Sequence, residues 1–235
     1  MYNTELFILF ILLLICIFCI YVIYESFKLC KKYYDVNEVC PELLSIYNYK
    51  DIMSEVDSVR KMVWDEWPEK ELYLTENKTW NIYPFKAFGL DITDNCEKCP
   101  NLSRFINSIP GIKIAILSRL GPGMKLAPHQ GWGGHSNNVI RCHFGIDVPD
   151  GCYISVADEP DLSDEEIRYH KNGEWLCFDD SKIHYAHNSS NKDRIVLIVD
   201  VQRPSTIAKG TSKAGDTKEL LDIVNYYKQR YSSSK

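Results

Sequence analysis

Five short apolar segments in the second half of the chain constrain its fold most strongly. Each is rich in branched or aromatic residues, and glycine, proline, asparagine or aspartate separates it from the next. They cover residues 112–118, 139–148, 152–157, 174–178 and 195–201. No helical periodicity lies between them, which argues against a βαβ arrangement. The pattern therefore predicts a mainly β barrel or sandwich with flanking helices.

The apolar N-terminal segment is a second constraint. Residues 6–24 carry no charge, and these 19 residues are long enough to cross a bilayer as a helix. A cleaved signal peptide is the alternative, but residues 1–5 hold no lysine or arginine and no small-residue cleavage pattern follows. We therefore expect one retained transmembrane helix. Lys28, Lys31 and Lys32 follow it directly, which favours a cytosolic catalytic domain.

The remaining sequence indicates one globular domain with additions. The 235 residues carry a net charge of −5, which argues against a nucleic-acid partner because such a partner needs a basic surface. An apolar stripe predicts a helix over residues 51–67, and Leu220, Ile223, Val224 and Tyr227 predict a C-terminal helix packed on the domain. We divide the chain into an anchor with a basic flank (1–32), a tether with a helix (33–79), the β domain (80–204), and a linker with a C-terminal helix (205–235).

Histidines and arginines are concentrated around the strand candidates. His129 and His184 lie far apart in the sequence, and neutral imidazoles are the commonest protein ligands of transition metals. Arg141 and His143 share one face of a strand, where burial is costly unless they meet an anion. Arg194 begins a strand and can hold a carboxylate through two hydrogen bonds. Together they predict a metal site that also binds a dicarboxylate.

Other candidates are weaker. A single histidine is more often a hydrogen-bonded core residue, and we interpret the remaining three, His135, His170 and His187, as loop residues. Trp80 either lies in the core or lines a pocket. The pair Cys96 and Cys99 lacks a second ligand pair for zinc, so we interpret it as structural or incidental, with a disulfide possible in an oxidising lumen.

Several motifs occur together in the predicted β domain. They are Ser118, Pro128-His129-x-Gly131, Arg141-Cys142-His143-x-Gly145, Phe178-Asp179-Asp180-Ser181-x-x-His184, and Arg194 with Val199-Asp200-Val201-x-x-Pro204. In this combination and spacing, residues 80–204 resemble the aspartyl/asparaginyl β-hydroxylases, which are Fe(II)- and 2-oxoglutarate-dependent dioxygenases. The family includes membrane-anchored lipid A hydroxylases. The resemblance implies a double-stranded β-helix, or jelly roll, with O₂ as the oxidant.

The resemblance also implies roles for individual residues. His129 and His184 correspond to the iron ligands, and Arg194 to the partner of the distal 2-oxoglutarate carboxylate. Four further residues correspond to co-substrate contacts: Trp80, Ser118, Arg141 and His143. Gly131 stands where many related oxygenases carry a ligating carboxylate. It either leaves room for water at the metal or provides a backbone conformation with positive φ.

The resemblance leaves the substrate open. Ser118 and Gly131 favour the β-carbon of Asp or Asn side chains in a polypeptide, as in the animal enzymes, which face the ER lumen. The anchor and its lysines favour a membrane lipid acyl chain, as in the bacterial lipid hydroxylases. A catalytically inactive, membrane-tethered binding protein is the third alternative. Intact His129, His184 and Arg194 argue against it.

Overall fold

The computed structural model describes residues 2–26, 28, 30–46, 49–73 and 79–231. It divides into two compact units, of which the first contains residues 1–30 and 204–208 and the second residues 31–203 and 209–235. Helix α1 (Tyr2–Ser26) belongs to the first unit. Its stretch Leu6–Ile23 is not buried by the protein and is long and apolar enough to cross a membrane. This agrees with the predicted N-terminal transmembrane helix.

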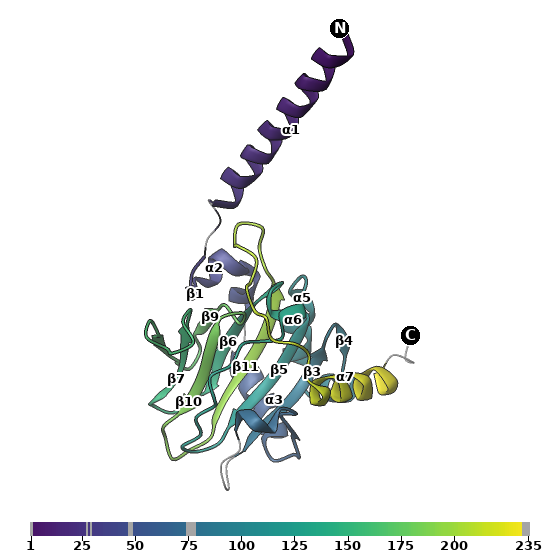
Figure 1. Cartoon of the computed structure of the whole chain (residues 1–235). Coiled ribbons are helices and arrows are strands. Elements are labelled where there is room, and N and C mark those ends of the chain that lie inside the picture. The colour runs from purple at the N-terminus through teal and green to yellow at the C-terminus, as the bar shows by residue number, and fades with distance from the viewer. Residues whose placement is uncertain (1, 27, 29, 47–48, 74–78, 232–235) are drawn as a thin grey trace. The chain divides into compact units, whose positions relative to one another are not determined.

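Two antiparallel sheets form the second unit (Figure 1). The larger sheet has the order β1 (Tyr33–Tyr34), β9 (Trp175–Phe178), β6 (Val139–Asp147), β11 (Arg194–Gln202), β5 (Ile114–Leu120), β3 (Trp80–Ala87) and β2 (Asp65–Glu66), with β4 (Leu90–Asp91) also paired to β3. The smaller sheet has the order β10 (Ile183–Asn188), β7 (Cys152–Ala157) and β8 (Glu166–Tyr169). The fold is the predicted jelly roll.

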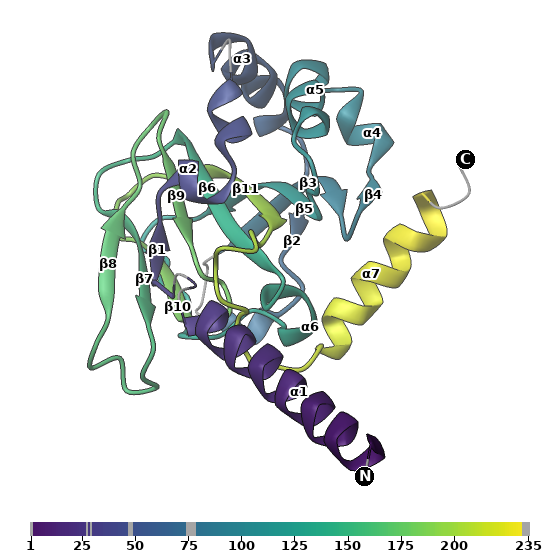
Figure 2. The ribbon, with the colours of Figure 1, turned by 90° about the horizontal axis from the view of Figure 1, so that it is seen from above.

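Helices flank this β structure. They are α2 (Val36–Val39), η1 (Pro41–Ser45), α3 (Tyr49–Arg60), η2 (Lys70–Leu72), α4 (Thr93–Cys96), α5 (Pro100–Ser108), α6 (Gly133–Ser136) and α7 (Lys218–Tyr231). Helices α3, α4 and α5 lie on one side of the large sheet, and the small sheet lies on the other (Figure 2). Both faces of the large sheet are therefore covered, which explains why every residue of β11 except Gln202 is buried.

Alternation along the strands creates an inner face between the two sheets. On β11, Arg194, Val196, Ile198 and Asp200 share this face. The registers place Arg194 opposite Leu120 of β5, Ile198 opposite His143 of β6, and Asp200 opposite Arg141 of β6. The inner face thus collects polar residues from strands that are distant in the sequence.

The structure differs from the predicted boundaries in three places. The helix predicted over residues 51–67 ends at Arg60. Beyond it, Val63 is 96% exposed, and Trp64 packs back onto the helix and donates to the Val59 carbonyl. The segment predicted as a tether begins with strand β1, which pairs with β9. Strands β8 and β10 were not among the five strand candidates. Polar residues interrupt the apolar pattern of β10, Ile183-His184-Tyr185-Ala186-His187-Asn188.

Candidate active site

His129 and His184 are direct neighbours across two antiparallel segments. The His129 amide donates to the His184 carbonyl at 3.0 Å, and the His184 amide donates to the His129 carbonyl at 2.8 Å. Residues paired in this way carry their side chains on the same face. The two imidazole ring centroids accordingly lie 4.4 Å apart. The backbone therefore brings together the two histidines predicted as metal ligands.

Each of the two imidazoles is held by a carbonyl two residues earlier in the chain. His129 Nδ1 lies 2.8 Å from the Ala127 oxygen, and His184 Nδ1 lies 2.9 Å from the Lys182 oxygen. A carbonyl can only accept, so Nδ1 carries the proton and Nε2 keeps its lone pair. Desolvation lowers the pKa of His129 to about 4 and holds the pKa of His184 well below its usual range. Both rings are therefore neutral at pH 7, as metal ligation requires.

The group around His129 and His184 holds fewer than three metal-binding side chains among the described residues. Within the described ranges, no three His, Cys, Asp or Glu side chains form a group that could hold a metal ion. Asp180 Oδ1 lies 3.3 Å from His184 Nε2. A Cβ added to Gly131 would lie 2.0 Å from Asp180 Oδ2, so the Asp180 carboxylate occupies the space beside this glycine. Gly131 is not among the residues with positive φ, and the interpretation that it provides such a conformation is wrong.

Arg141 is surrounded by carboxylates of the protein itself. Its Nε and Nη2 donate to the two oxygens of Asp200, both at 2.8 Å, and its Nη1 lies 2.5 Å from Asp180 Oδ1. His135 of α6 contacts the same Asp200 through Nε2 at 2.9 Å. The two carboxylates and the Asp200 hydrogen bond raise the pKa of Arg141 against the effect of burial. The structure thus differs from the expectation that Arg141 needs an external anion.

The two carboxylates of this network have opposite pKa shifts. Burial raises the pKa of Asp180 to about 6, against the attraction of Arg141. The pKa of Asp200 is held below its usual range, because Arg141 and the hydrogen bonds to Asp200 outweigh the effect of burial. Asp200 is therefore the fixed counter-ion of Arg141.

Arg194 provides the contrasting case. Its side chain is 2% exposed, and among the described residues its Nε and Nη1 have no hydrogen-bond partner. Burial lowers the pKa of Arg194 to about 10, which still leaves it charged at pH 7. A buried guanidinium without a protein carboxylate is costly unless an anion binds it. This arrangement fits a carboxylate ligand.

His143 lies between the two arginines along the inner face and contacts a histidine that the sequence did not single out. His143 Nδ1 is 3.0 Å from His170 Nε2, and both side chains are buried. His143 Nε2 has no hydrogen-bond partner within the described part of the chain. Burial, followed by the charges of neighbouring residues, lowers the pKa of both imidazoles well below the usual range. His170 therefore holds one nitrogen of His143 while the other stays available.

One pocket collects all the residues predicted for the site. Its lining includes Trp80, Ser118, His129, Arg141, His143, His184 and Arg194. Trp80 also donates from Nε1 to Ser118 Oγ at 3.0 Å, so two of the residues predicted to contact the co-substrate contact each other. The juxtaposition follows from the registers, whereas the individual roles remain predictions.

Sequence reasoning missed four residues of this arrangement. Asp180 and Asp200 lie inside the motifs quoted above, and Asp200 faces Arg141 only once β6 and β11 pair. His135 and His170 were interpreted as loop residues, yet His135 lies in α6 and both contact predicted site residues or their partners. His187 lies in β10 and contacts Tyr153. No local sequence signal distinguishes His170 from His187.

Comparison with known proteins gives consistent matches. Residues 47–204 match the family model described as aspartyl/asparaginyl beta-hydroxylase. The mouse (Mus musculus) aspartate beta-hydroxylase domain-containing protein 2 is 34% identical over 143 residues, which cover 57% of this chain and 39% of that protein. The ornithine lipid ester-linked acyl 2-hydroxylase of Rhizobium tropici is 31% identical over 166 residues, covering 67% of this chain and 55% of that protein. The chain thus spans well under two thirds of these relatives.

Solved structures with similar coordinates include an oxidoreductase of the 2OG-Fe(II) oxygenase family from Burkholderia pseudomallei. The likeness has a TM-score of 0.46 at 11% sequence identity and covers 68% of this chain and 81% of that chain.

Proposed function

Because the chain belongs to the aspartyl/asparaginyl beta-hydroxylase family, we propose that it is an Fe(II)- and 2-oxoglutarate-dependent dioxygenase that hydroxylates an unactivated C–H bond. The observation that carries this proposal is Arg194, a buried guanidinium without a carboxylate partner among the described residues, in the same pocket as two neutral imidazoles. Two imidazole donors fit a metal that takes its other ligands from a chelating co-substrate and water.

His129 and His184 would hold the iron through their Nε2 atoms. The carbonyls of Ala127 and Lys182 fix the orientation of the two rings. Bound iron would supply the activation of O₂ that couples decarboxylation of 2-oxoglutarate, to succinate and CO₂, to the insertion of one oxygen atom into the substrate C–H bond. The geometry of the site would be set by the backbone pairing of the two histidines.

The co-substrate carboxylate would bind Arg194. Two of the three guanidinium nitrogens, Nε and Nη1, lack protein acceptors in the described part of the chain, which leaves them available for a bidentate contact. Ser118 Oγ accepts from Trp80, so its own proton can be donated to the same ligand. His143 Nε2 offers a further polar contact, held in place by His170.

Arg141 and Asp180 would position groups near the metal without binding the co-substrate tightly. The bidentate contact with Asp200 fixes the Arg141 guanidinium, which in turn contacts Asp180 beside His184. Gly131 is required here because any side chain at this position would displace the Asp180 carboxylate.

Two substrate classes follow from the relatives. An Asp or Asn side chain in a polypeptide is the class predicted from the sequence and fits the name of the mouse relative. A membrane lipid acyl chain is the second class; it fits the name of the Rhizobium relative, and the apolar residues Leu126, Ile154 and Phe178 in the pocket lining favour it. Both would be hydroxylated by the same metal chemistry.

We also propose that helix α1 anchors the protein in a membrane, with the jelly roll on the cytosolic side and the ER lumen as the alternative. Two of the three lysines that favour this orientation, Lys31 and Lys32, lie in ion pairs of the folded unit, with Glu38 and with Asp164 respectively. Their charges therefore serve the fold as well. A glycosylation acceptor engineered near the C-terminus would stay unmodified on the cytosolic side, and efficient modification would place the domain in the lumen.

The decisive experiment is succinate release by the full chain in detergent micelles. With Fe(II), 2-oxoglutarate and O₂, we expect succinate to form, and either His129→Ala or His184→Ala to abolish it and to reduce the bound iron. His187→Ala is the matched control, because His187 also lies in β10 but contacts Tyr153 instead of lining the pocket. If the chain binds iron and 2-oxoglutarate but releases no succinate with any substrate tested, it is an inactive binding protein.

A further inference from the structure

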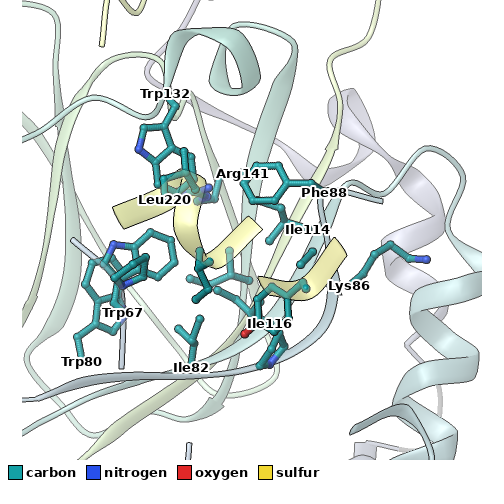
Figure 3. A pocket seen from close by; sticks show the side chains of 16 residues that line it. Trp67, Trp80, Ile82, Lys86, Phe88, Ile114, Ile116, Trp132, Arg141 and Leu220 are labelled. Carbon is teal, nitrogen blue, oxygen red and sulfur yellow. The ribbon is translucent and has the colours of Figure 1, made fainter. Parts of the chain in front are cut away.

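A second pocket adjoins the candidate active site. It is lined almost entirely by apolar side chains, with Ile82, Ile114, Ile116 and Ile198 contributed by strands β3, β5 and β11 (Figure 3). Trp80, Arg141 and Ile198 line both pockets. The two pockets are therefore neighbours, and these three residues lie between them.

The polar atoms in the wall of this pocket already have partners within the protein. Lys86 pairs with Asp91, Arg141 with Asp180 and Asp200, and the Tyr227 hydroxyl donates to Asp65 at 3.0 Å. The indole nitrogens are also satisfied: Trp67 and Trp132 donate to Glu69, and Trp80 to Ser118. A ligand in this pocket is thus offered apolar contact and few free hydrogen-bonding groups.

Three tryptophans give the pocket a rigid wall. Trp67 is stacked between Trp80 and Trp132, with ring centroids 4.3 Å and 5.8 Å away and the planes within 13° and 5° of parallel. The carboxylate of Glu69 accepts from two of them, at 3.3 Å from Trp67 and 2.8 Å from Trp132. Such a wall is formed before any ligand binds, so the ligand does not have to order it.

Helix α7 forms the remaining side of the pocket. Leu220, Ile223 and Tyr227 line it, and Thr217 Oγ1 donates to Glu69 at 3.0 Å, which joins the start of the helix to the tryptophan wall. Residues 218–231 lie beyond the range matched by the family model, which ends at residue 204. This side of the pocket is therefore built outside the matched family domain.

We propose that the apolar pocket binds a hydrocarbon chain of the substrate, an acyl chain, and that α7 determines which chain fits. This inference rests on the proposed dioxygenase function and selects between its two substrate classes. A polypeptide carries amide groups, which would lose their hydrogen bonds to water and find few partners in this wall. An acyl chain has no such groups, and Ile198, which lines both pockets, places a chain bound here next to the pocket of His129 and His184.

The reaction is balanced for this substrate. One C–H bond of the acyl chain is broken and one C–O bond is formed with an oxygen atom from O₂. The other oxygen atom enters succinate as 2-oxoglutarate loses CO₂, and the hydrogen of the broken C–H bond ends on the new hydroxyl group. 2-Oxoglutarate thus supplies two of the four electrons that the reduction of O₂ requires, and the C–H bond supplies the other two.

The test uses quenching of tryptophan fluorescence by bromine, because three of the five tryptophans line the pocket. The full chain in detergent micelles, loaded with iron and 2-oxoglutarate without O₂, is titrated with a long-chain fatty acid brominated in mid-chain. The unbrominated acid gives the baseline. Ile223→Phe narrows the pocket, whereas Leu221→Phe is the matched control on the same helix, since Leu221 is 47% exposed and outside the lining.

We expect saturable quenching in the wild type and in Leu221→Phe, and at least fivefold weaker binding in Ile223→Phe. Ile223→Ala, which enlarges the pocket, is expected to keep binding and guards against misfolding of the larger variant. Absent quenching, or equal quenching in Ile223→Phe and Leu221→Phe, would overturn the inference. So would succinate release with an Asp- or Asn-containing peptide that Ile223→Phe leaves unchanged. Iron and 2-oxoglutarate binding, measured on the same samples, reports separately on the proposed function.

Discussion

Arg141 and Arg194 line the same pocket, but their surroundings differ. Arg141 makes a bidentate contact with Asp200 and a further contact with Asp180, whereas Nε and Nη1 of Arg194 have no partner within the described residues. Both side chains project from the inner face of the large sheet, and Asp200 and Arg194 are six positions apart on β11. At about 3.3 Å per residue, the backbone positions of Asp200 and Arg194 are therefore about 20 Å apart along the strand.

This difference separates an arginine that belongs to the structure of the fold from an arginine that is available to bind a ligand. A buried charge that the protein neutralises stabilises the fold only as long as its partner is present. A buried charge that the protein leaves unpaired destabilises the ligand-free fold and is available to a ligand. From the sequence alone, both arginines are expected to have the same role, as partners of one dicarboxylate.

The largest effect is expected from removing the counter-ion of Arg141. Asp200→Ala leaves the buried Arg141 without its bidentate partner, and we expect the free energy of unfolding to fall by about 3–5 kcal/mol. Denaturant unfolding of the full chain in micelles measures this. Asp193→Ala, at an exposed position close to the start of β11, should change stability by less than about 0.5 kcal/mol. Similar effects of the two substitutions would contradict the comparison.

Arg194→Met should have the opposite effect on the ligand-free protein. The substitution removes a buried charge whose Nε and Nη1 have no partner among the described residues, and it keeps most of the side-chain volume, so stability should stay the same or rise by about 1 kcal/mol. Thermal unfolding without 2-oxoglutarate checks this. A loss of more than about 2 kcal/mol would show that Arg194 has a structural partner.

His170→Phe should weaken the site through His143. The substitution removes the acceptor or donor for His143 Nδ1, a hydrogen bond worth about 0.5–1.5 kcal/mol, and this corresponds to a KM for 2-oxoglutarate that is roughly twofold to slightly more than tenfold higher. The kcat should change less, and His170→Gln, which keeps a polar partner, should recover part of the loss. Equal effects of His170→Phe and His187→Phe on KM would exclude the positioning role.

The acid dependence of stability separates Asp200 from its surroundings. The pKa of Asp200 is lowered in the folded chain, so its stabilising contribution is complete above the usual Asp value of about 3.9 and is lost as the pH falls through the folded value. The difference in unfolding free energy between the wild type and Asp200→Asn should therefore narrow as the pH falls below about 4. A difference independent of pH would show that Asp200 is not the charged partner of Arg141.

Much of this arrangement could be predicted from local sequence. Apolar segments separated by turn residues predicted strands β5, β6, β9 and β11 of the large sheet and β7 of the small sheet. The residues His129, Arg141, His143, His184 and Arg194, which the sequence predicted for one site, share a pocket. The prediction failed where the partner is distant in the chain and the local signal is weak. Nothing near Arg141 in the sequence shows that Asp180 and Asp200 neutralise it, because both contacts arise from strand pairing and loop closure.

The N-terminal flank illustrates the same limit. In the sequence, Lys31 and Lys32 are typical of the basic residues that flank a membrane helix. In the structure, Lys31 pairs with Glu38, and Lys32 pairs with Asp158, Asp164 and Glu166, all in the folded unit. Such charge pairs between distant segments carry no periodicity that a sequence could display.

The most direct test of the account is the affinity of the iron-loaded full chain for 2-oxoglutarate, measured by calorimetry without O₂ in the wild type and in Arg194→Met. A buried bidentate contact with a carboxylate is worth on the order of 2–5 kcal/mol, so the variant should bind at least tenfold more weakly while its iron content stays the same. An unchanged affinity in Arg194→Met would contradict the central claim that this buried arginine is the co-substrate's partner.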